Sequence, residues 1–138
     1  MASLIYNSAI DDMARGAIDF DTDSFKAMLV TSSYTPNKDT DLKRSAVTNE
    51  VTGTGYTAGG VTCACTVTKD TANDKVTLSF AAVSWASSTI TARALVIYKS
   101  RGGASSADEL VAYVDFGSNV SSTGGTFSVT ASTVTLQN

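Results

Sequence analysis

The sequence predicts an all-β protein, an antiparallel two-sheet sandwich or jelly roll of about eight strands, in a single domain over residues 1–138. Short segments rich in Val, Ile and Thr alternate with Gly, Asn, Asp and Ser turns at regular spacing, which is typical of such sandwiches. The hydrophobic content of 43% suits a buried core, and the charged content of 17% is low because Ser and Thr occupy the strands. We therefore expect sheets whose outer faces are polar but weakly charged.

Residues 1–18 are expected to form a short N-terminal helix or arm. In the helical interpretation, which covers residues 8–18, Ser8 is the N-cap and Gly16 ends the helix. The alternative is an extended arm that docks on a neighbouring molecule through three apolar residues, Leu4, Ile5 and Tyr6. An apolar tip ahead of the first folded element also packs commonly against its own domain, so both arrangements remain open.

Residues 25–31 predict the first long strand, and residues 32–48 predict a long surface loop after it. The strand is almost continuously apolar, so we expect both of its faces to be covered. The loop holds the only proline, among Ser, Asn, Lys and Asp residues, and loops of this length are commonly either functional or mobile. Its candidates for partner contacts are Tyr34, Pro36 and Lys38.

A glycine-rich segment, residues 49–61, links this irregular first third to the β-rich remainder. Four glycines within eight residues predict successive tight turns, because glycine adopts positive φ angles without steric cost. Residues 53–58 match the G-x-G-x-x-G/A dinucleotide pattern, which binds pyrophosphate only where a helix follows. Residues 61–68 are β-branched and predict a strand, so we interpret the glycines as structural.

Seven short strands are predicted after the glycine-rich segment. We place them at residues 61–69, 75–80, 82–86, 92–99, 110–116, 126–130 and 133–137. Turn residues separate them at 72–74, 101–103, 119–125 and 131–132. Trp85 is expected to anchor the core rather than to form a ligand platform.

Catalysis is not predicted. The chain contains no histidine, which excludes Ser-His-Asp and Cys-His catalysis and histidine-based metal sites. Cys63 and Cys65 lie two residues apart on one predicted strand and are expected to remain free thiols. Asp115 lies inside an apolar strand, where we expect it to face Lys99 or Arg93 rather than to act as a catalytic acid. We expect no enzyme activity, no cofactor and no metal.

Charge and hydropathy narrow the classes of partner. A net charge of −3 with scattered basic residues argues against nucleic acid. No apolar stretch approaches the ~20 residues of a membrane span. The N-terminus lacks a signal peptide pattern, so we expect synthesis in a cytoplasm.

The acidic run at residues 19–23 begins like an EF-hand calcium loop but lacks the Gly and Glu found later in such a loop. We interpret it as a solvated segment that leads into the strand.

Several parts of the chain, in order, carry a resemblance to a known family. They include D-F-D-T-D-S-F-K-A-M-L-V-T-S and G-T-G-Y-T-A-G-G-V, and they lie at residues 19–32, 48–51, 53–61, 89–94, 96–99 and 110–117. These segments resemble small structural proteins of tailed bacteriophages, the jelly-roll capsid cement or decoration proteins. The resemblance covers most of the chain.

This resemblance implies a non-enzymatic virion protein that binds the outside of a phage capsid and cements neighbouring major capsid protein subunits. It implies a homodimer on the capsid surface, made in the cytoplasm of the host bacterium, with no catalytic residues and no cofactor. The alternative is a head- or tail-fibre module that binds a host-surface glycan, with Tyr98 or Tyr113 stacking on sugars. The residues expected to contact the capsid or a second copy are Leu4, Ile5, Tyr6, Tyr34, Pro36 and Lys38.

Overall fold

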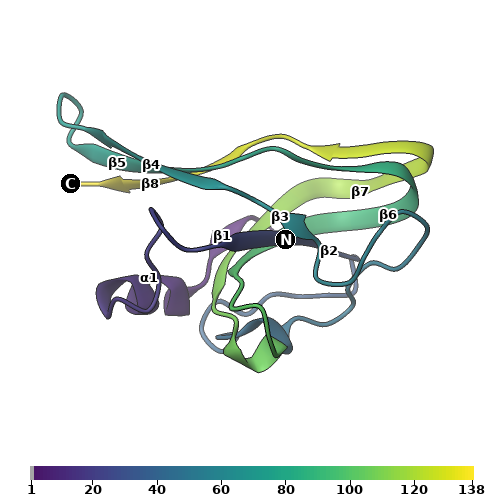
Figure 1. The fold of residues 1–138 in the computed structure, drawn as a ribbon, viewed down its shortest axis with the longest axis horizontal. Helices are drawn as coiled ribbons and strands as arrows, with labels where there is room; N and C mark the ends of the chain where they lie inside the picture. Colours follow the sequence, from purple (N-terminus) through teal and green to yellow (C-terminus); the bar gives the residue numbers. More distant parts are fainter. Residues whose placement is uncertain (1) are drawn as a thin grey trace.

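The computed structural model describes residues 2–138 and forms a β-sandwich of two antiparallel sheets (Figure 1). One sheet has the strand order β1-β7-β6-β2-β3 and the other has the order β4-β5-β8. The predicted all-β sandwich with a short N-terminal helix is confirmed. The described elements are β1 (Leu4–Ile5), α1 (Asn7–Ala14), β2 (Phe25–Val30), η1 (Arg44–Ala46), β3 (Val61–Thr62), β4 (Cys65–Asp70), β5 (Lys75–Phe80), β6 (Val83–Lys99), η2 (Ser105–Ala107), β7 (Leu110–Val129) and β8 (Ser132–Gln137).

The space between the two sheets holds the larger hydrophobic core. Side chains alternate along each strand, so Val67, Leu78 and Val134 form one cross-strand row on the inner face of the three-stranded sheet. Trp85 is only 3% exposed and packs against the ring of Phe127, with the ring centroids 6.1 Å apart. The expected role of Trp85 as a core anchor is confirmed.

A second, smaller core covers the opposite face of the five-stranded sheet. Alternation along β2 sends Ala27 and Leu29 into the larger core and Met28 and Val30 into the smaller one. The N-terminal segment and the loop after β2 cover this face, and the buried aromatic side chains that they contribute are Tyr6 and Tyr34. The prediction that this strand is covered on both faces is confirmed.

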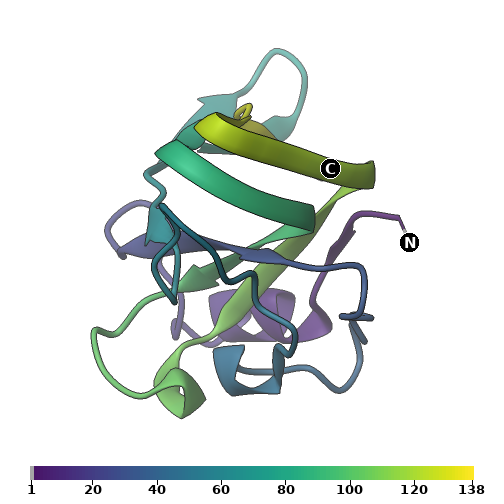
Figure 2. The same cartoon turned by 90° about the vertical axis from the view of Figure 1, so that its right-hand side faces the viewer.

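Strands β6 and β7 form one long hairpin that curls over one end of the sandwich (Figures 1 and 2). The predicted breaks at residues 87–91 and 119–125 are wrong, because both segments continue their strands. The Ser and Thr residues there, which are typical of turns, pair across the hairpin instead. Thr91 Oγ1 lies 2.7 Å from Ser121 Oγ, for example. Several shifts of register bend the hairpin, as β-bulges do.

Helix α1 begins at Asn7 and ends sooner than predicted. Tyr6 occupies the N-cap position without a side-chain hydrogen bond, so the assignment of Ser8 as the N-cap is wrong. The hydroxyl of Ser8 is buried in the first turn, with no hydrogen-bond partner among the described residues. The chain reverses at Gly16, which has a φ of +79° and donates its amide to the carbonyl of Met13 at 3.2 Å.

The glycine-rich segment packs its turns directly on the five-stranded sheet. Gly53, Gly55, Gly59 and Gly60 all have positive φ angles, which confirms the predicted succession of turns. A Cβ atom on Gly60 would lie 1.8 Å from the carbonyl oxygen of Ala27, so no larger residue fits there. The segment then enters β3 rather than a helix, and the dinucleotide pattern therefore lacks the structure that binds pyrophosphate.

Candidate functional site

The N-terminal candidates lie against the chain's own sheet. Strand β1 pairs antiparallel with β7, with Leu4 opposite Tyr113 and Ile5 opposite Ala112. Leu4 and Ile5 are half-buried. Tyr6 is fully buried, so of the two arrangements left open by the sequence the extended arm is wrong and packing against the chain's own domain is confirmed. The apolar tip is instead tucked against its own sheet.

Tyr6, Tyr34 and Asp41 form a buried chain of hydrogen bonds. The two tyrosine hydroxyls lie 2.8 Å apart, and Tyr34 donates to Oδ2 of Asp41 at 2.8 Å. Burial raises the pKa of both tyrosines far above its ordinary value, so both hydroxyls stay protonated. Tyr34 and Pro36 are both buried, which corrects the expectation that they are available for partner contacts in a surface loop. Pro36 and Tyr34 therefore offer little surface to a partner.

The loop over residues 32–48 is fixed to the rest of the chain along its length. Asn7 donates its amide to the carbonyl of Lys38 at 3.0 Å, and Arg44 donates its amide to the carbonyl of Asp108 at 2.9 Å. Lys38 itself is exposed, unlike the other two loop candidates. The loop therefore serves as the cover of the smaller core, and only part of it remains available to a partner.

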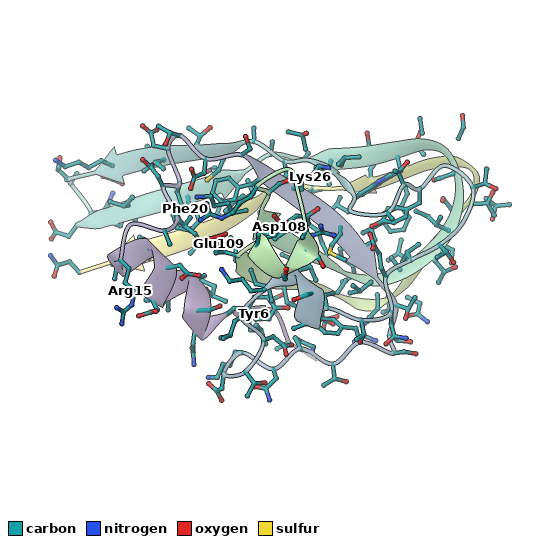
Figure 3. All side chains as sticks on the ribbon, turned by 60° about the horizontal axis from the view of Figure 1, so that its bottom comes forward. Tyr6, Arg15, Phe20, Lys26, Asp108 and Glu109 are labelled. Atoms are coloured by element: carbon teal, nitrogen blue, oxygen red, sulfur yellow. The ribbon has the colours of Figure 1, made fainter. Side chains whose placement is uncertain are left out.

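Two buried carboxylates, Asp108 and Glu109, form the centre of an ion-pair cluster whose basic partners are partly exposed (Figure 3). Arg44 Nε donates to Asp108 at 2.8 Å, and Arg101 Nε lies 2.9 and 3.0 Å from the two carboxylate oxygens of Glu109. Burial alone would raise the pKa of Glu109, but the hydrogen bond from Arg101 and the charge of Lys43 hold the pKa below its ordinary value. A carboxylate that is ionised and paired in this way stabilises the fold and is poorly suited to acid–base work.

The other acidic candidates are also paired. Arg93, one of the two partners expected from the sequence, donates to Asp115 at 2.8 Å, and this bond holds the pKa of Asp115 at about 2. Lys99 forms an ion pair with Asp23 at 2.8 Å, so one acid of the 19–23 run is occupied by a basic side chain. Asp115 and Asp23 are therefore accounted for by structural ion pairs.

The two cysteines are free thiols, as expected. Burial raises the pKa of Cys63, and burial together with the neighbouring thiol raises the pKa of Cys65 to about 11. Both are thus protonated at neutral pH. Within residues 2–138, no three His, Cys, Asp or Glu side chains converge as metal ligands. None of the helices in this part of the chain has the length and apolar character needed to cross a membrane.

An uncharged surface covers the curled hairpin and part of the outer face of the three-stranded sheet. Residues 76–92 and 116–138 contain no Asp, Glu, Lys or Arg. The outer face of the three-stranded sheet carries hydroxyl side chains in two cross-strand rows, Thr66–Ser79–Thr133 and Thr68–Thr77–Thr135, and the row beyond them is Asp70–Lys75–Gln137. We call these six residues the hydroxyl face. It is polar without charge, which lowers the desolvation cost of covering it with another protein.

Strand β8 forms an open edge of the same sheet and lies beside an apolar groove. The groove, lined by residues of α1, β5 and β8, contains the two exposed apolar side chains Ile10 and Leu136, which are 53% and 36% exposed. A neighbouring cavity of about 300 Å³ lies between β8 and β1. Figure 1 shows α1 and β1 on the same side of β8. The groove and the β8 edge together form the best candidate for a contact site in the described residues.

Sequence reasoning missed this site, although part of its signal was present. The absence of charge over residues 116–138 is visible in the sequence and indicates a surface that tolerates burial. The alternation T-V-T-L at residues 133–136 predicts a half-buried strand. It does not predict that this strand lies at an edge, because edge position depends on the pairing of the whole sheet.

Comparisons of the chain with protein-family models, curated proteins and solved structures found no match. The resemblance to phage cement proteins therefore remains a hypothesis. The functional argument rests on the physical character of the hydroxyl face, the β8 edge and the apolar groove.

Proposed function

We propose that the protein is a non-enzymatic structural component of a bacteriophage virion. It binds the outside of the capsid and cements neighbouring major capsid protein subunits. The observation that carries the proposal is the uncharged hydroxyl face beside the apolar groove. A surface of this kind, on a sandwich whose buried carboxylates are held in internal ion pairs, suits protein contacts better than chemistry on a small substrate.

The energetics of such a surface favour many modest contacts. Removing a charged group from water costs several kcal/mol, which is on the order of a whole weak interface. The hydroxyl face avoids that cost, since hydroxyl groups exchange water for other hydrogen-bond partners more cheaply. Many copies on one shell then resist the internal pressure together. Each copy that bridges two subunits adds its modest binding free energy to the stability of the shell.

A homodimer is part of the proposal. A two-fold unit presents two equal binding surfaces, so it can hold two neighbouring shell subunits at once. Light scattering on the purified chain measures this directly. A particle mass twice the 14.3 kDa of one chain supports the dimer, and a mass equal to one chain at micromolar concentration contradicts it.

The glycan-binding alternative loses the two residues on which it depended. Tyr98 and Tyr113 are each 1% exposed, and Tyr98 donates its hydroxyl to the carbonyl of Gly59 at 2.6 Å. A sugar stacks on the open face of an aromatic ring, and neither ring has one. We therefore propose the capsid-binding function alone.

The proposal is tested by counting copies of the chain in purified virions of the phage that encodes it. We expect an abundance comparable to that of the major capsid protein. Particles assembled without the chain should lose their DNA at a lower temperature than complete particles do. A handful of copies per virion, or a position away from the head, would contradict the cementing role.

A further inference from the structure

We propose that β8 is a strand-addition site, at which an extended, uncharged segment of a capsid subunit pairs with the open edge of the three-stranded sheet. The identity of the partner rests on the proposed function, whereas the mode of binding rests on the geometry of β8. In strand addition, main-chain hydrogen bonds supply affinity and pockets for alternate side chains supply specificity.

Among residues 2–138, no main-chain hydrogen bond occupies the backbone groups that this pairing needs. Asn138 donates its amide to the carbonyl of Asp74 at 3.0 Å, so these two residues form a hydrogen-bonded pair. Such pairs alternate along an antiparallel ladder, so Leu136 and Val134 also bond to β5. The residues between them turn their N–H and C=O groups away from β5, and they are the exposed residues Thr133, Thr135 and Gln137.

The β8 edge lacks the features that protect open edges in other sheets. It is six residues long, contains no charged residue and no proline, and pairs with β5 without a bulge. The opposite edge of the same sheet is β4, which carries Lys69 and Asp70. An unprotected edge of this length is a template for another strand, and its lack of charge favours a segment that is itself uncharged.

The groove specifies the side chains of the added segment. Alternate residues of a strand next to β8 would face the groove, where Val134 and Leu136 meet Ile10 and Met13 of α1. The groove is lined by apolar residues, so apolar side chains fit there. The intervening residues would extend the rows of the hydroxyl face, so small hydroxyl-bearing side chains fit on that side. The predicted partner is a segment in which apolar and hydroxyl-bearing residues alternate.

The test uses two proline variants that each remove one edge amide not bonded to β5. Thr135→Pro removes such an amide from β8. On β4, Ala64 accepts a hydrogen bond from Ala81, so Thr66 and Thr68 bond to β5 and the amide of Lys69 points away from it. Lys69→Pro therefore removes the corresponding amide from the β4 edge. Thermal unfolding first verifies that both variants are folded. We then expect Thr135→Pro to bind capsid shells stripped of the chain about tenfold more weakly than wild type. Lys69→Pro should bind as wild type does.

The outcomes separate the two proposals. Equal binding by wild type and Thr135→Pro would overturn strand addition while the cementing role stands. No shell binding by wild type would overturn the cementing role itself. If Thr135→Pro does not fold, Thr135→Lys replaces it, with Thr68→Lys in the same hydroxyl row as its control.

Amide hydrogen exchange provides a second readout on the wild-type chain. Addition of stripped shells should slow exchange at Thr133, Thr135 and Gln137, because their amides gain partners. Unchanged exchange at these three residues in shell-bound protein would overturn the proposal. The proposal would also be overturned if exchange at these residues slows when the concentration of the free chain is raised in the absence of shells. In that case β8 would pair with a second copy of the chain.

Discussion

At the scale of single residues, burial decides which ion pairs matter for stability. The side chain of Glu109 is 3% exposed, and its charge is balanced by Arg101. Arg15 and Asp11 also form an ion pair, but their side chains are 74% and 58% exposed. Figure 3 shows Arg15 pointing away from the body of the molecule, whereas Glu109 lies within it. Water competes with the exposed pair, whereas it has little access to the carboxylate of Glu109, although the side chain of Arg101 is 43% exposed.

We predict that Glu109→Gln lowers the free energy of unfolding by about 2 kcal/mol, because it removes charge-assisted hydrogen bonds and sets an amide donor beside the Arg101 guanidinium. Asp11→Asn removes an exposed pair with the same chemical change and should cost less than about 0.5 kcal/mol. Urea unfolding of both variants at pH 7 measures the difference. Equal losses in the two variants would contradict the importance of burial.

The pKa of Asp115 predicts a dependence of stability on pH. Its hydrogen bond from Arg93 lowers the pKa from an ordinary value of 3.8 to about 2. Because the folded-state pKa is the lower one, the stabilisation is complete above pH 3.8 and is lost as the pH falls towards 2. Asp115→Asn should therefore be less stable than wild type at pH 7, and the gap should narrow between pH 4 and pH 2. A gap that stays constant in urea unfolding across this range would show that the Arg93 contact does not set the pKa.

At the scale of elements, the loop over residues 32–48 acts as a structural cover. Its only regular element is the short helix η1, and it is held by hydrogen bonds to the N-terminal segment and to the start of β7. The buried hydroxyls of Tyr6 and Tyr34 join the two segments that cover the smaller core. The order of this loop therefore depends on a few buried polar contacts.

We predict that Tyr34→Phe lowers the free energy of unfolding by about 1–2 kcal/mol, because it leaves the hydroxyl of Tyr6 and one oxygen of Asp41 without this partner. Amide exchange should become faster across residues 37–46. Tyr6→Phe is the matched control, with a smaller expected cost of about 1 kcal/mol, since Tyr34 can still donate to Asp41. A Tyr34→Phe variant with wild-type stability and exchange would show that side-chain packing alone orders the loop.

At the scale of the whole molecule, charge is divided unequally between two parts of the chain. The stretches that form β8 and the curled end of the β6–β7 hairpin contain no charged residues. Among residues 2–138, the helix α1, the loop after β2 and the η2 region carry most of the ion pairs. Binding through the hydroxyl face and β8 edge should therefore be nearly independent of ionic strength.

We predict that binding to stripped capsid shells changes by less than about twofold between roughly 50 and 500 mM NaCl. Contacts between charged groups weaken over this range because salt screens them, whereas contacts of hydroxyl and apolar groups do not. Affinity measured by co-sedimentation at several salt concentrations checks the prediction. A tenfold loss at high salt would move the contact to the charged loop that contains Lys38.

The elements that the sequence predicted well are those with a local pattern. Strands β2, β5 and β8 lie within two residues of their predicted bounds, because alternation or continuous hydrophobicity identifies a strand without knowledge of its neighbours. The hairpin of β6 and β7 was predicted as separate short strands. Its Ser, Thr and Gly residues favour turns in isolation, and only pairing across the hairpin makes them strand.

The candidate contact residues likewise include one whose exposure was predicted from residue type and three whose position depended on tertiary packing. Lys38 was predicted to be exposed and is exposed, since a charged side chain seldom loses water whatever the fold. Tyr6, Tyr34 and Pro36 were candidates for partner contacts and are buried, and for Tyr6 the sequence had left packing against its own domain as an open alternative. Apolar side chains take the position that tertiary packing offers them, so the same sequence pattern fits an exposed arm or the cover of a second core.

The sequence by itself determined the all-β class, the turns of the glycine-rich segment, the free thiols and the lack of histidine chemistry. These follow from residue type and local spacing, which act over a few residues of chain. Only the tertiary structure decided that the loop covers a second core, that Asp108 and Glu109 are buried and paired with Arg44 and Arg101, and that β8 is an open edge beside an apolar groove. Each of these depends on residues far apart in the chain, and the free energy that places them comes from burial shared among several elements.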